Sequence, residues 1–502
     1  MKTQKILNKV FNKKTIIIPV VMGLLNLAAM PVLASIKIEA AYVLYGQSSD
    51  LSLLPMARVI LAGTGQTCPQ LTKVGAGDQA NVSMSIRINP DELNFPVTVC
   101  EAIYPFSTQM QVESSDIMLP KINKNIVNIS IFGDTGCKSS HQDCQLNSSN
   151  WPFPSLVAKA AEATSKPDVI LHMGDYNYSG TPGNIAIKGL ANKVQVYDAG
   201  DNTTQGLCQI PGAYYGQNSI GSEFPDSWKH WQSDFFSAAQ PLFSQAPWAF
   251  VRGNHELCSR AGPGWFYFLD ASSPLLGKYH SQLSCPAAEN PNPEVLSPPY
   301  LLSFSSLNLA VIDSTNACDY GLLNSDSYIN QFSILQNLIK SADNNKPTWL
   351  QMHRPLWGVD GLDAGGSCGN NSSAQYCYVN QTMQNAIKHS PLAKSVDLIV
   401  SGHMHRFQLV DFKSKKRPDQ LVIGNSGVKL SGLHPKTTKV LKIDNKKATV
   451  MGLKQFGYMN ISLSGNKSWV GELLNPNLAE PVLLQCDSKK YPMCKKTKNL
   501  AN

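Results

Sequence analysis

The sequence predicts an α/β protein that is preceded by a small β-rich domain, and three observations support this prediction. Apolar strand-like runs alternate with segments of helical periodicity through most of the chain. Polar clusters built on Gly-Asp, Gly-Asn-His and Gly-His follow these runs directly, which is where ligands bind in α/β sheets. Before residue 122, short apolar runs instead stand between Gly, Asp, Asn and Pro, without sustained helical periodicity.

Residues 1–34 have the pattern of a signal peptide. A lysine-rich start is followed by an apolar stretch, Thr15–Met30, and then by Val32-Leu33-Ala34, whose small residues suit cleavage after Ala34. The apolar stretch of 16 residues is short for a membrane span and is interrupted by Pro19 and Asn26. We therefore predict a secreted or periplasmic protein that has no membrane contact once the leader is removed. An uncleaved anchor is the alternative.

Residues 35–122 are predicted to form the N-terminal β-rich domain. Strand-like runs occur at Ala57–Leu61, Val82–Ile88 and Pro96–Ile103, separated by turn-forming residues. Pro120 and the polar residues 121–125 mark the end of this region.

Residues 123–484 are predicted to form the α/β domain. Buried strands are expected at Ile126–Phe132, Val169–Met173, Trp248–Val251, Leu307–Ile312, Trp349–Met352 and Asp397–Val400. Helices are expected at Pro154–Ala163 and Trp228–Phe243. Gly180–Gly221 and Gly358–Asn380 are long inserts of the kind that form lids or mobile loops, and residues 485–502 are predicted to be a lysine-rich C-terminal tail.

Twelve cysteines, all beyond the leader, indicate disulfide bonds. None forms a Cys-x-x-Cys pair, which disfavours a zinc ribbon or a thioredoxin-type motif. An exported protein meets an oxidising compartment, where disulfides persist. The predicted pairs are Cys68–Cys100, Cys137–Cys144, Cys368–Cys377 and Cys486–Cys494.

The net charge of +8 does not indicate a nucleic-acid partner. Five lysines belong to the leader, which leaves 8 − 5 = +3 for the mature chain. No long basic run is present in the body of the protein that could follow a phosphate backbone. The sequence makes no prediction about oligomeric state.

Five polar clusters contain residue types that bind metal ions. They are Asp134 in Gly-Asp-Thr-Gly, Asp175 and Tyr178 in Gly-Asp-Tyr-Asn-Tyr, Asn254 and His255 in Gly-Asn-His-Glu, His353 in Met-His-Arg-Pro, and His403 and His405 in Gly-His-Met-His. A single Gly-Asp after a strand is more often a turn or a helix cap. Five such clusters, each following an apolar strand, predict one shared metal site.

In this order the clusters resemble the motifs GDxG, GDxxY, GNHE, xxxH and GHxH of the calcineurin-like metallophosphoesterases. Tyr178 is similar to the tyrosine that distinguishes the purple acid phosphatase branch, and the resemblance extends from about Ile126 to Leu430. It implies a sandwich of two mixed β-sheets flanked by helices. It also differs from the plant-type pattern, because no histidine occurs between His353 and His389.

The resemblance implies a binuclear metal centre. Asp134, Asp175, Tyr178 and His405 would hold ferric iron, and Asp175 would bridge to a divalent iron, zinc or manganese ion held with Asn254, His353 and His403. The donor types fit this division, because phenolate and carboxylate oxygens suit a trivalent ion, whereas imidazoles and an amide suit a divalent one.

The activity implied by the resemblance is acid hydrolysis of small-molecule phosphate monoesters by a metal-bound hydroxide. His255 would face the phosphate as transition-state stabiliser and proton donor. Two alternatives remain: a secreted phosphodiesterase or nucleotidase with the same site, and a non-catalytic binding or adhesion protein that acts through the β-rich domain.

Three further residues near the motifs carry weaker expectations. His172 is expected to pack or to support a ligand, and Asp313 is expected to cap the end of its strand. Arg354 is a candidate phosphate ligand, although a structural role is the more frequent one for such an arginine.

Overall fold

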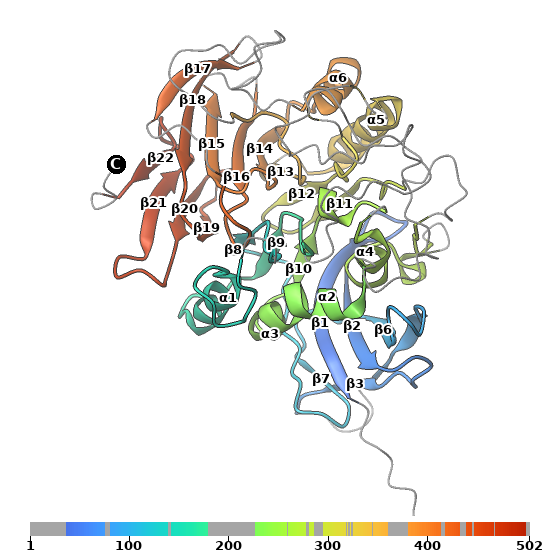
Figure 1. Cartoon of the computed structure of the whole chain (residues 1–502). Helices are drawn as coiled ribbons and strands as arrows, with labels where there is room; N and C mark the ends of the chain where they lie inside the picture. The colour runs from blue at the N-terminus through green and yellow to red at the C-terminus, as the bar shows by residue number, and fades with distance from the viewer. Residues whose placement is uncertain are drawn as a thin grey trace, which may run out of the picture. The chain divides into compact units, whose positions relative to one another are not determined.

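Two large β-sheets and one small sheet form the computed structural model, with helices beside the large sheets (Figure 1). The structure describes residues 37–75, 81–138, 142–178, 226–258, 260–277, 281–285, 295–317, 319, 322, 325–343, 345–359, 380–412, 417–431, 438–443, 446–465 and 467–497. The predicted leader, the insert Gly180–Gly221, most of Gly358–Asn380 and the predicted pair Cys368–Cys377 lie outside these residues.

The first large sheet has eleven strands in the order β22-β21-β20-β19-β8-β9-β10-β1-β2-β6-β5. Their bounds are β1 Ile38–Gln47, β2 Leu53–Ala62, β5 Ser85–Ile88, β6 Val97–Ile103, β8 Asn128–Phe132, β9 Val169–His172, β10 Trp248–Phe250, β19 Tyr458–Leu463, β20 Trp469–Leu474, β21 Val482–Asp487 and β22 Cys494–Lys496. The central strands β8, β9, β10 and β1 are parallel, and the outer pairs are antiparallel, so the sheet is mixed.

The second large sheet has eight strands in the order β11-β12-β13-β14-β16-β15-β18-β17. Their bounds are β11 Tyr300–Ser303, β12 Asn308–Val311, β13 Thr348–Gln351, β14 Val396–Ser401, β15 Phe407–Phe412, β16 Asp419–Ile423, β17 Lys439–Ile443 and β18 Lys446–Leu453. Here β12, β13, β14 and β16 are parallel, while β11, β15, β17 and β18 pair in antiparallel fashion. The predicted sandwich of two mixed sheets is confirmed.

A single hydrophobic core lies between the two large sheets. Ile129, Leu171 and Ala249 of the first sheet belong to the same buried cluster as Trp349 and Leu398 of the second. A polar contact also crosses this interface, because the Gln351 side-chain amide donates to the backbone oxygens of His172 (3.1 Å) and Ala249 (3.0 Å). The ends of β9, β10 and β13 are thereby brought together, and these strands lead into predicted site residues.

Helices cover the other faces of the sheets, as their aromatic and aliphatic residues require. On the first sheet these are α1 Phe153–Glu162, α2 Trp228–Trp231, a π-helical turn Gln232–Phe236 and α3 Ser237–Phe243, packed in a second core with Phe132 and Trp248. On the second sheet α5 Ser325–Ser341 and α6 Gln381–His389 pack against Leu350 and Ile399. The predicted helix Trp228–Phe243 is therefore helical throughout, with one widened turn.

The N-terminal region is rich in strands as predicted, but four of them extend the first large sheet. β1 pairs in parallel with β10, with Leu44 opposite Trp248, and β2, β6 and β5 follow outward. The run Val82–Ile88 divides into β4 (Val82–Ser83), which pairs with β3 (Gln70–Lys73), and β5, which pairs with β6. β7 (Met110–Val112) completes the small sheet β4-β3-β7. A domain boundary at residue 122 stays a prediction.

The C-terminal residues continue the first sheet to Lys496 rather than forming a separate tail from residue 485. β21 and β22 make an antiparallel hairpin closed by the Cys486–Cys494 disulfide. The backbone N–H of Met493 donates to Asp411 of β15 at 2.7 Å, which ties this hairpin to the second sheet. Four lysines of the hairpin, Lys489, Lys490, Lys495 and Lys496, are exposed or half-buried, and β22 is the edge strand of the sheet, where charged side chains discourage further strand pairing.

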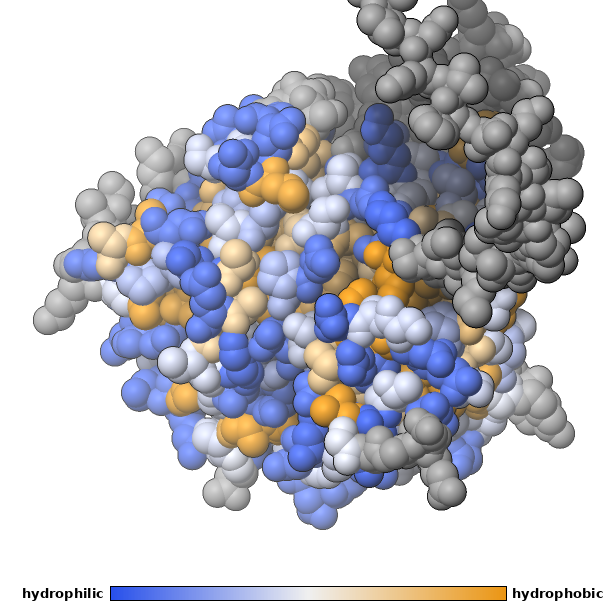
Figure 2. All heavy atoms as spheres, turned by 90° about the horizontal axis from the view of Figure 1, so that it is seen from below, coloured by the Kyte–Doolittle hydropathy of each residue, from blue (hydrophilic) through white to orange (hydrophobic). Residues whose placement is uncertain are grey.

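Three predicted disulfides are confirmed: Cys68–Cys100, Cys137–Cys144 and Cys486–Cys494. A fourth, Cys258–Cys285, joins residues that the sequence did not indicate as partners. Figure 2, which shows the molecule from below, has polar residues over much of that face with small apolar areas between them. Among the described residues, no helix has both the length and the apolar character to cross a bilayer.

Candidate metal centre

The predicted ligands follow the carboxyl ends of five parallel strands from both large sheets. Asp134, Asp175 and Asn254 follow β8, β9 and β10, which are neighbours in the first sheet. His353 follows β13, and His403 and His405 follow β14, its neighbour in the second sheet. Since parallel neighbours end at the same edge, each sheet gathers its ligands at one place, and the sandwich brings the two groups together.

Four of these ligands have a backbone conformation that most residues avoid. The φ angles are +54° at Asp134, +59° at Asp175, +73° at His403 and +45° at His405. Non-glycine residues in the left-handed region are uncommon, and they concentrate at functional sites where the surroundings impose them. Gly174, at φ +90°, has no such cost, and a Cβ there would lie 2.6 Å from Nδ1 of His353.

Asp175 lies at the centre of the cluster. Its Oδ2 accepts a hydrogen bond from the Tyr178 hydroxyl at 2.7 Å, and its Oδ1 accepts one from the backbone N–H of His255 at 2.9 Å. The same Oδ1 is 3.3 Å from Nε2 of His353. Asp175 therefore touches groups from both sheets, as a bridging ligand must.

Asp134, Tyr178 and His405 lie on one side of Asp175. The Tyr178 hydroxyl is 2.9 Å from Nε2 of His405, and that nitrogen is 3.7 Å from Oδ1 of Asp134. Both carboxylate oxygens of Asp134 accept from the backbone N–H of His403, at 2.9 and 2.8 Å. This half of the cluster contains the phenolic and carboxylic oxygens that were expected around a trivalent ion.

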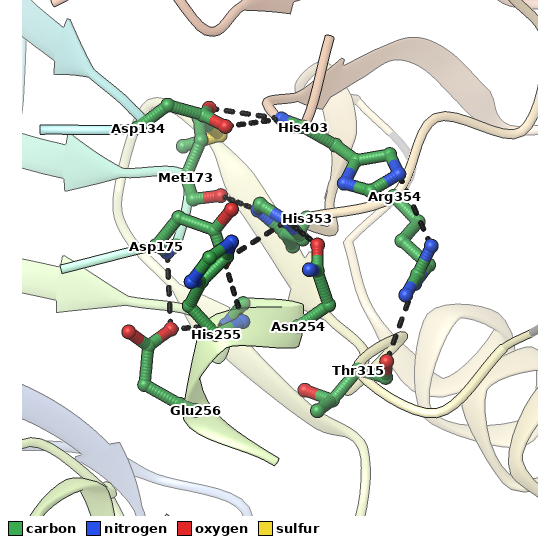
Figure 3. Close-up of polar contacts among 12 residues, drawn as sticks. Asp134, Met173, Asp175, Asn254, His255, Glu256, Thr315, His353, Arg354 and His403 are labelled. Atoms are coloured by element: carbon green, nitrogen blue, oxygen red, sulfur yellow. Dashed lines mark hydrogen bonds and ion pairs between the residues drawn. The ribbon is translucent and has the colours of Figure 1, made fainter. Parts of the chain in front are cut away.

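Asn254 and His353 lie on the other side of Asp175, and their geometry tests whether a cation fits. The carbonyl of Met173 can only accept, so Nδ1 of His353, 2.6 Å away, carries the proton of the neutral ring. Nε2 is then an acceptor, yet it faces Oδ1 of Asn254 at 2.9 Å and Oδ1 of Asp175 at 3.3 Å (Figure 3). Three acceptors turned toward one another require a cation or an added proton between them, so the residues fit a metal ion.

Two groups of side chains can each surround one ion. Asp175, His353 and His403 offer ligand atoms within 4.8 Å of one another, and Asp134, Asp175 and His405 do the same. Asp175 is common to both groups. The shared carboxylate agrees with the bridging role expected from the sequence.

Burial and mutual repulsion perturb the acids of this cluster. Burial, and then the charge of Asp175, raises the pKa of Asp134 well above its usual range, and the same two causes raise the pKa of the Tyr178 phenol. Burial acts in the same direction on Asp175, but without a bound metal the positive charge of the surrounding histidines, His353 first, holds its pKa well below its usual range. The raised pKa values mean that Asp134 and Tyr178 keep their protons in the metal-free protein. Bound metal ions would displace these protons and would supply the positive charge that buried anions need.

Glu256 organises the oxygen ligands, a role that the sequence reasoning did not assign. Its carboxylate accepts four backbone N–H groups, from Asp175 (3.0 Å), Tyr176 (2.8 Å), Asn177 (3.2 Å) and Gly253 (3.0 Å). Burial, and then the charge of Asp175, raises its pKa to about 8. The sequence feature that could have indicated this role is the place of Glu256 in Gly-Asn-His-Glu, directly after two predicted site residues. A buried acid at such a place needs hydrogen-bond donors, and the nearby loop backbones supply them.

His172 supports the loops that carry two predicted ligands, and Asp313 caps the end of its strand, as predicted. His172 accepts from the Gly174 N–H at Nδ1 (3.2 Å), and its Nε2 lies 2.9 Å from the Thr135 hydroxyl. Asp313 accepts from the backbone N–H groups of Thr315 and Ser297, both at 2.9 Å. Neither side chain is part of the two candidate metal groups among the described residues.

Arg354 contacts protein groups rather than standing at the surface. It is 3% exposed, and its guanidinium donates to Asp319 at 2.5 Å and to the Thr315 carbonyl at 3.2 Å. Nε2 of His403 lies 3.1 Å from it. This placement favours the structural role over direct phosphate binding.

Comparisons with known proteins identify a family for this chain and a similar fold. The family described as calcineurin-like phosphoesterase matches residues 127–407, a span that contains all seven predicted ligands and His255. A purple acid phosphatase from yellow lupin (Lupinus luteus) seeds has the same fold, with a TM-score of 0.51, 13% identity, and coverage of 88% of this chain and 72% of that one. A dimetal phosphatase from Danio rerio gives a TM-score of 0.36 and 9% identity, over 70% of this chain and 96% of that one. No curated protein sequence matches the chain.

Proposed function

Because this chain belongs to the calcineurin-like phosphoesterase family, we propose that it is an exported acid phosphatase of the purple acid phosphatase type. The reaction would be hydrolysis of phosphate monoesters at a two-metal centre. The observation that carries the proposal is the buried cluster around Asp175, in which ligands from both sheets meet and acceptor atoms face one another.

The ligands divide between two positions that share Asp175. Asp134, Tyr178 and His405 would complete the position for ferric iron, and Asn254, His353 and His403 the position for divalent iron, zinc or manganese. When bound, the two cations would lower the pKa of a water molecule and neutralise charge on the phosphate.

His255 would act on the leaving group. Its backbone N–H is anchored to Asp175 at 2.9 Å, and its ring lies against that of Tyr178, with the ring centroids 3.8 Å apart. These two contacts hold the imidazole beside the metal cluster without making it one of the candidate ligands in the two groups. An imidazolium there can give a proton to the departing oxygen as the ester bond breaks.

Export is supported by the leader pattern of residues 1–34 and by the disulfides of the described chain. Expression of the full chain with its leader should yield a mature protein that begins at Ser35. N-terminal sequencing of the product measures this directly, and a product that retains residues 1–34 would argue for an anchor instead.

The activity is tested by comparing a chromogenic phosphate monoester with the matching diester, at acid and at neutral pH. The purified full chain should prefer the monoester, should have an acid optimum, and should contain two metal ions per chain. A preference for the diester near neutrality would instead indicate the phosphodiesterase alternative. Two bound metals without activity on either ester would favour the binding or adhesion alternative.

A further inference from the structure

A carboxylate outside the predicted ligand set lies against the ring of His403. Nε2 of His403 is 3.1 Å from Oδ2 of Asp319. The backbone N–H of the same histidine donates to Asp134, so the residue is held at both its main chain and its ring. The Arg354 guanidinium is also 3.1 Å from Nε2 but already donates to Asp319, so Nε2–H can donate to the carboxylate and Nδ1 is then the ring nitrogen that would bind a metal ion.

Asp319 is itself fixed by three contacts, and it is fully buried. Oδ1 accepts from the side-chain amide of Asn380 at 3.2 Å, and Oδ2 accepts from the Arg354 guanidinium at 2.5 Å. Its backbone oxygen accepts from the N–H of Gln381 at 3.0 Å. Each carboxylate oxygen thus has its own partner, so the carboxylate cannot turn away from His403 without losing a bond.

The contact with Arg354 explains how the charged carboxylate of Asp319 can be buried. An isolated carboxylate is costly in the interior, but a short bond to a guanidinium offsets that cost when the other lone pairs are also satisfied. Arg354 follows His353 directly in the chain, and its guanidinium is 3.1 Å from Nε2 of His403. The guanidinium of Arg354 therefore stabilises the buried charge of Asp319, the carboxylate that lies against His403.

The contact with Asn380 connects this acid to a helix. Asn380 is the N-cap of α6, where its Oδ1 accepts from the N–H of Met383 at 2.9 Å. Its amide N–H₂ is the group that reaches Asp319. The start of α6 is thus linked through Asp319 to the ring of His403.

His353 and His403, the two histidines of the position proposed for the divalent ion, are oriented by different groups. His353 is oriented by a main-chain carbonyl, that of Met173, which carries no net charge. A carboxylate is a stronger acceptor and makes the imidazole a more basic ligand. We propose that Asp319 is a positioning residue that orients His403 and strengthens its bond to the divalent ion. This inference rests on the proposed two-metal function.

Metal titration of the chelator-treated full chain tests the inference without using activity. Asp319→Asn keeps the shape but removes the charge, and we expect binding of one of two Mn²⁺ or Zn²⁺ ions to weaken by about 10–100-fold. Asp313→Asn is the matched control, because Asp313 is also buried beside an arginine, Arg252 at 3.4 Å, and its other described partners are the backbone N–H groups of Thr315 and Ser297, which are not predicted ligands. The control should bind both ions as the wild type does.

A second variant separates orientation from folding. Asn380→Ser keeps a residue that caps helices well but removes the amide that holds Asp319. It should weaken the same ion by less than Asp319→Asn does, with the thermal unfolding of the metal-free protein close to that of the wild type. If both variants bind two ions with wild-type affinity, the inference is wrong and the two-metal proposal stands. If the wild type itself binds no second ion, the proposed function fails first.

Discussion

The site residues of the first sheet and those of the second sheet are held in place by opposite kinds of hydrogen bond. On the first sheet, the carboxylates of Asp134, Asp175 and Glu256 accept backbone N–H groups. On the second sheet, His353 and His403 face acceptors, a main-chain carbonyl and the Asp319 carboxylate. Anionic ligands need donors to offset their burial, whereas a neutral imidazole needs one acceptor to choose which nitrogen stays free for the metal.

Each side also depends on the other sheet. Asp134 of the first sheet accepts from the backbone of His403, and His353 of the second sheet contacts the carbonyl of Met173. The ligand geometry is therefore a property of the sandwich rather than of either sheet. Loss of Asp175, which contacts groups from both sheets, should therefore disturb the cluster most.

Replacing the shared carboxylate should have the largest effect. Asp175→Ala removes the only residue common to both candidate metal groups, so both ions should be lost and turnover should fall to that of the chelator-treated wild type. Metal analysis and a monoester assay measure the two quantities. Asp143→Ala, which changes an exposed acid after the first motif, is the control. Two ions retained in Asp175→Ala would remove Asp175 from the bridge.

Replacing His255 should separate chemistry from metal binding. His255→Ala is expected to lower turnover by about 10²–10⁴-fold because a proton donor to the leaving group is lost. Metal content should stay at the wild-type value, since neither side of the cluster loses a ligand. His389→Ala, at an exposed histidine of α6, should leave turnover unchanged. Equal turnover in His255→Ala and the wild type would exclude the proposed role.

Replacing Glu256 tests the hydrogen bonds that hold the loops of Asp175 and Asn254. In Glu256→Gln an amide –NH₂ must face backbone donors, so the free energy of unfolding should fall by about 1–3 kcal/mol. Urea unfolding of the metal-free protein above about pH 8, where Glu256 is ionised, measures this quantity. Glu162→Gln breaks an exposed pair with Lys159 and should cost about 0–1 kcal/mol. A similar small cost for both variants would mean that Glu256 does not hold the two loops.

The smallest predicted effect concerns a buried acid outside the cluster. Asp226 accepts from Trp231 and from the Gly264 N–H, both at 2.7 Å, and burial raises its pKa to about 7. The folded protein then binds more protons than the unfolded chain between about pH 4 and pH 7, so this group's contribution to stability falls as pH rises through that window. Asp226 belongs to neither candidate metal group, so a bound metal ion is not expected to offset its charge as it would for the predicted ligands.

Urea unfolding of metal-free wild type and Asp226→Asn at several pH values isolates this contribution. The variant cannot ionise at this position, so its unfolding free energy should fall less steeply between about pH 4 and pH 7. Parallel slopes in the two proteins would show that Asp226 does not titrate in that range.

The metal ligands could be predicted from the sequence because their signals are local. Asp134, Asp175 and His403 each come directly after a run of buried residues that forms a parallel strand, and the strand end places the side chain at the sheet edge. The supporting residues were harder to predict. Glu256 could be suspected from its motif, but Asp319 follows no recognisable pattern, and its partner His403 is 84 residues away.

The N-terminal region shows the same limit at the level of the fold. Its strand-rich character was visible in its short apolar runs, yet β1 joins β10 across about 200 residues of chain. Strand composition favours a sheet without naming the neighbour, because every backbone edge offers the same donors and acceptors. The composition of the region therefore could not predict the pairing of β1 with β10, and the hairpin of β21 and β22 could not be predicted for the same reason.

By itself, the sequence determined the α/β class, the order of the buried central strands and the identity of the side chains that follow them. These depend on hydrophobic periodicity and on short motifs, which act over a few residues. Only the tertiary structure decided which strands are neighbours, which nitrogen of His353 faces Asp175, and that Asp319 and Glu256 hold the ligands. Such contacts join distant segments, and their energies depend on burial and on exact partners that exist only after the two sheets have packed.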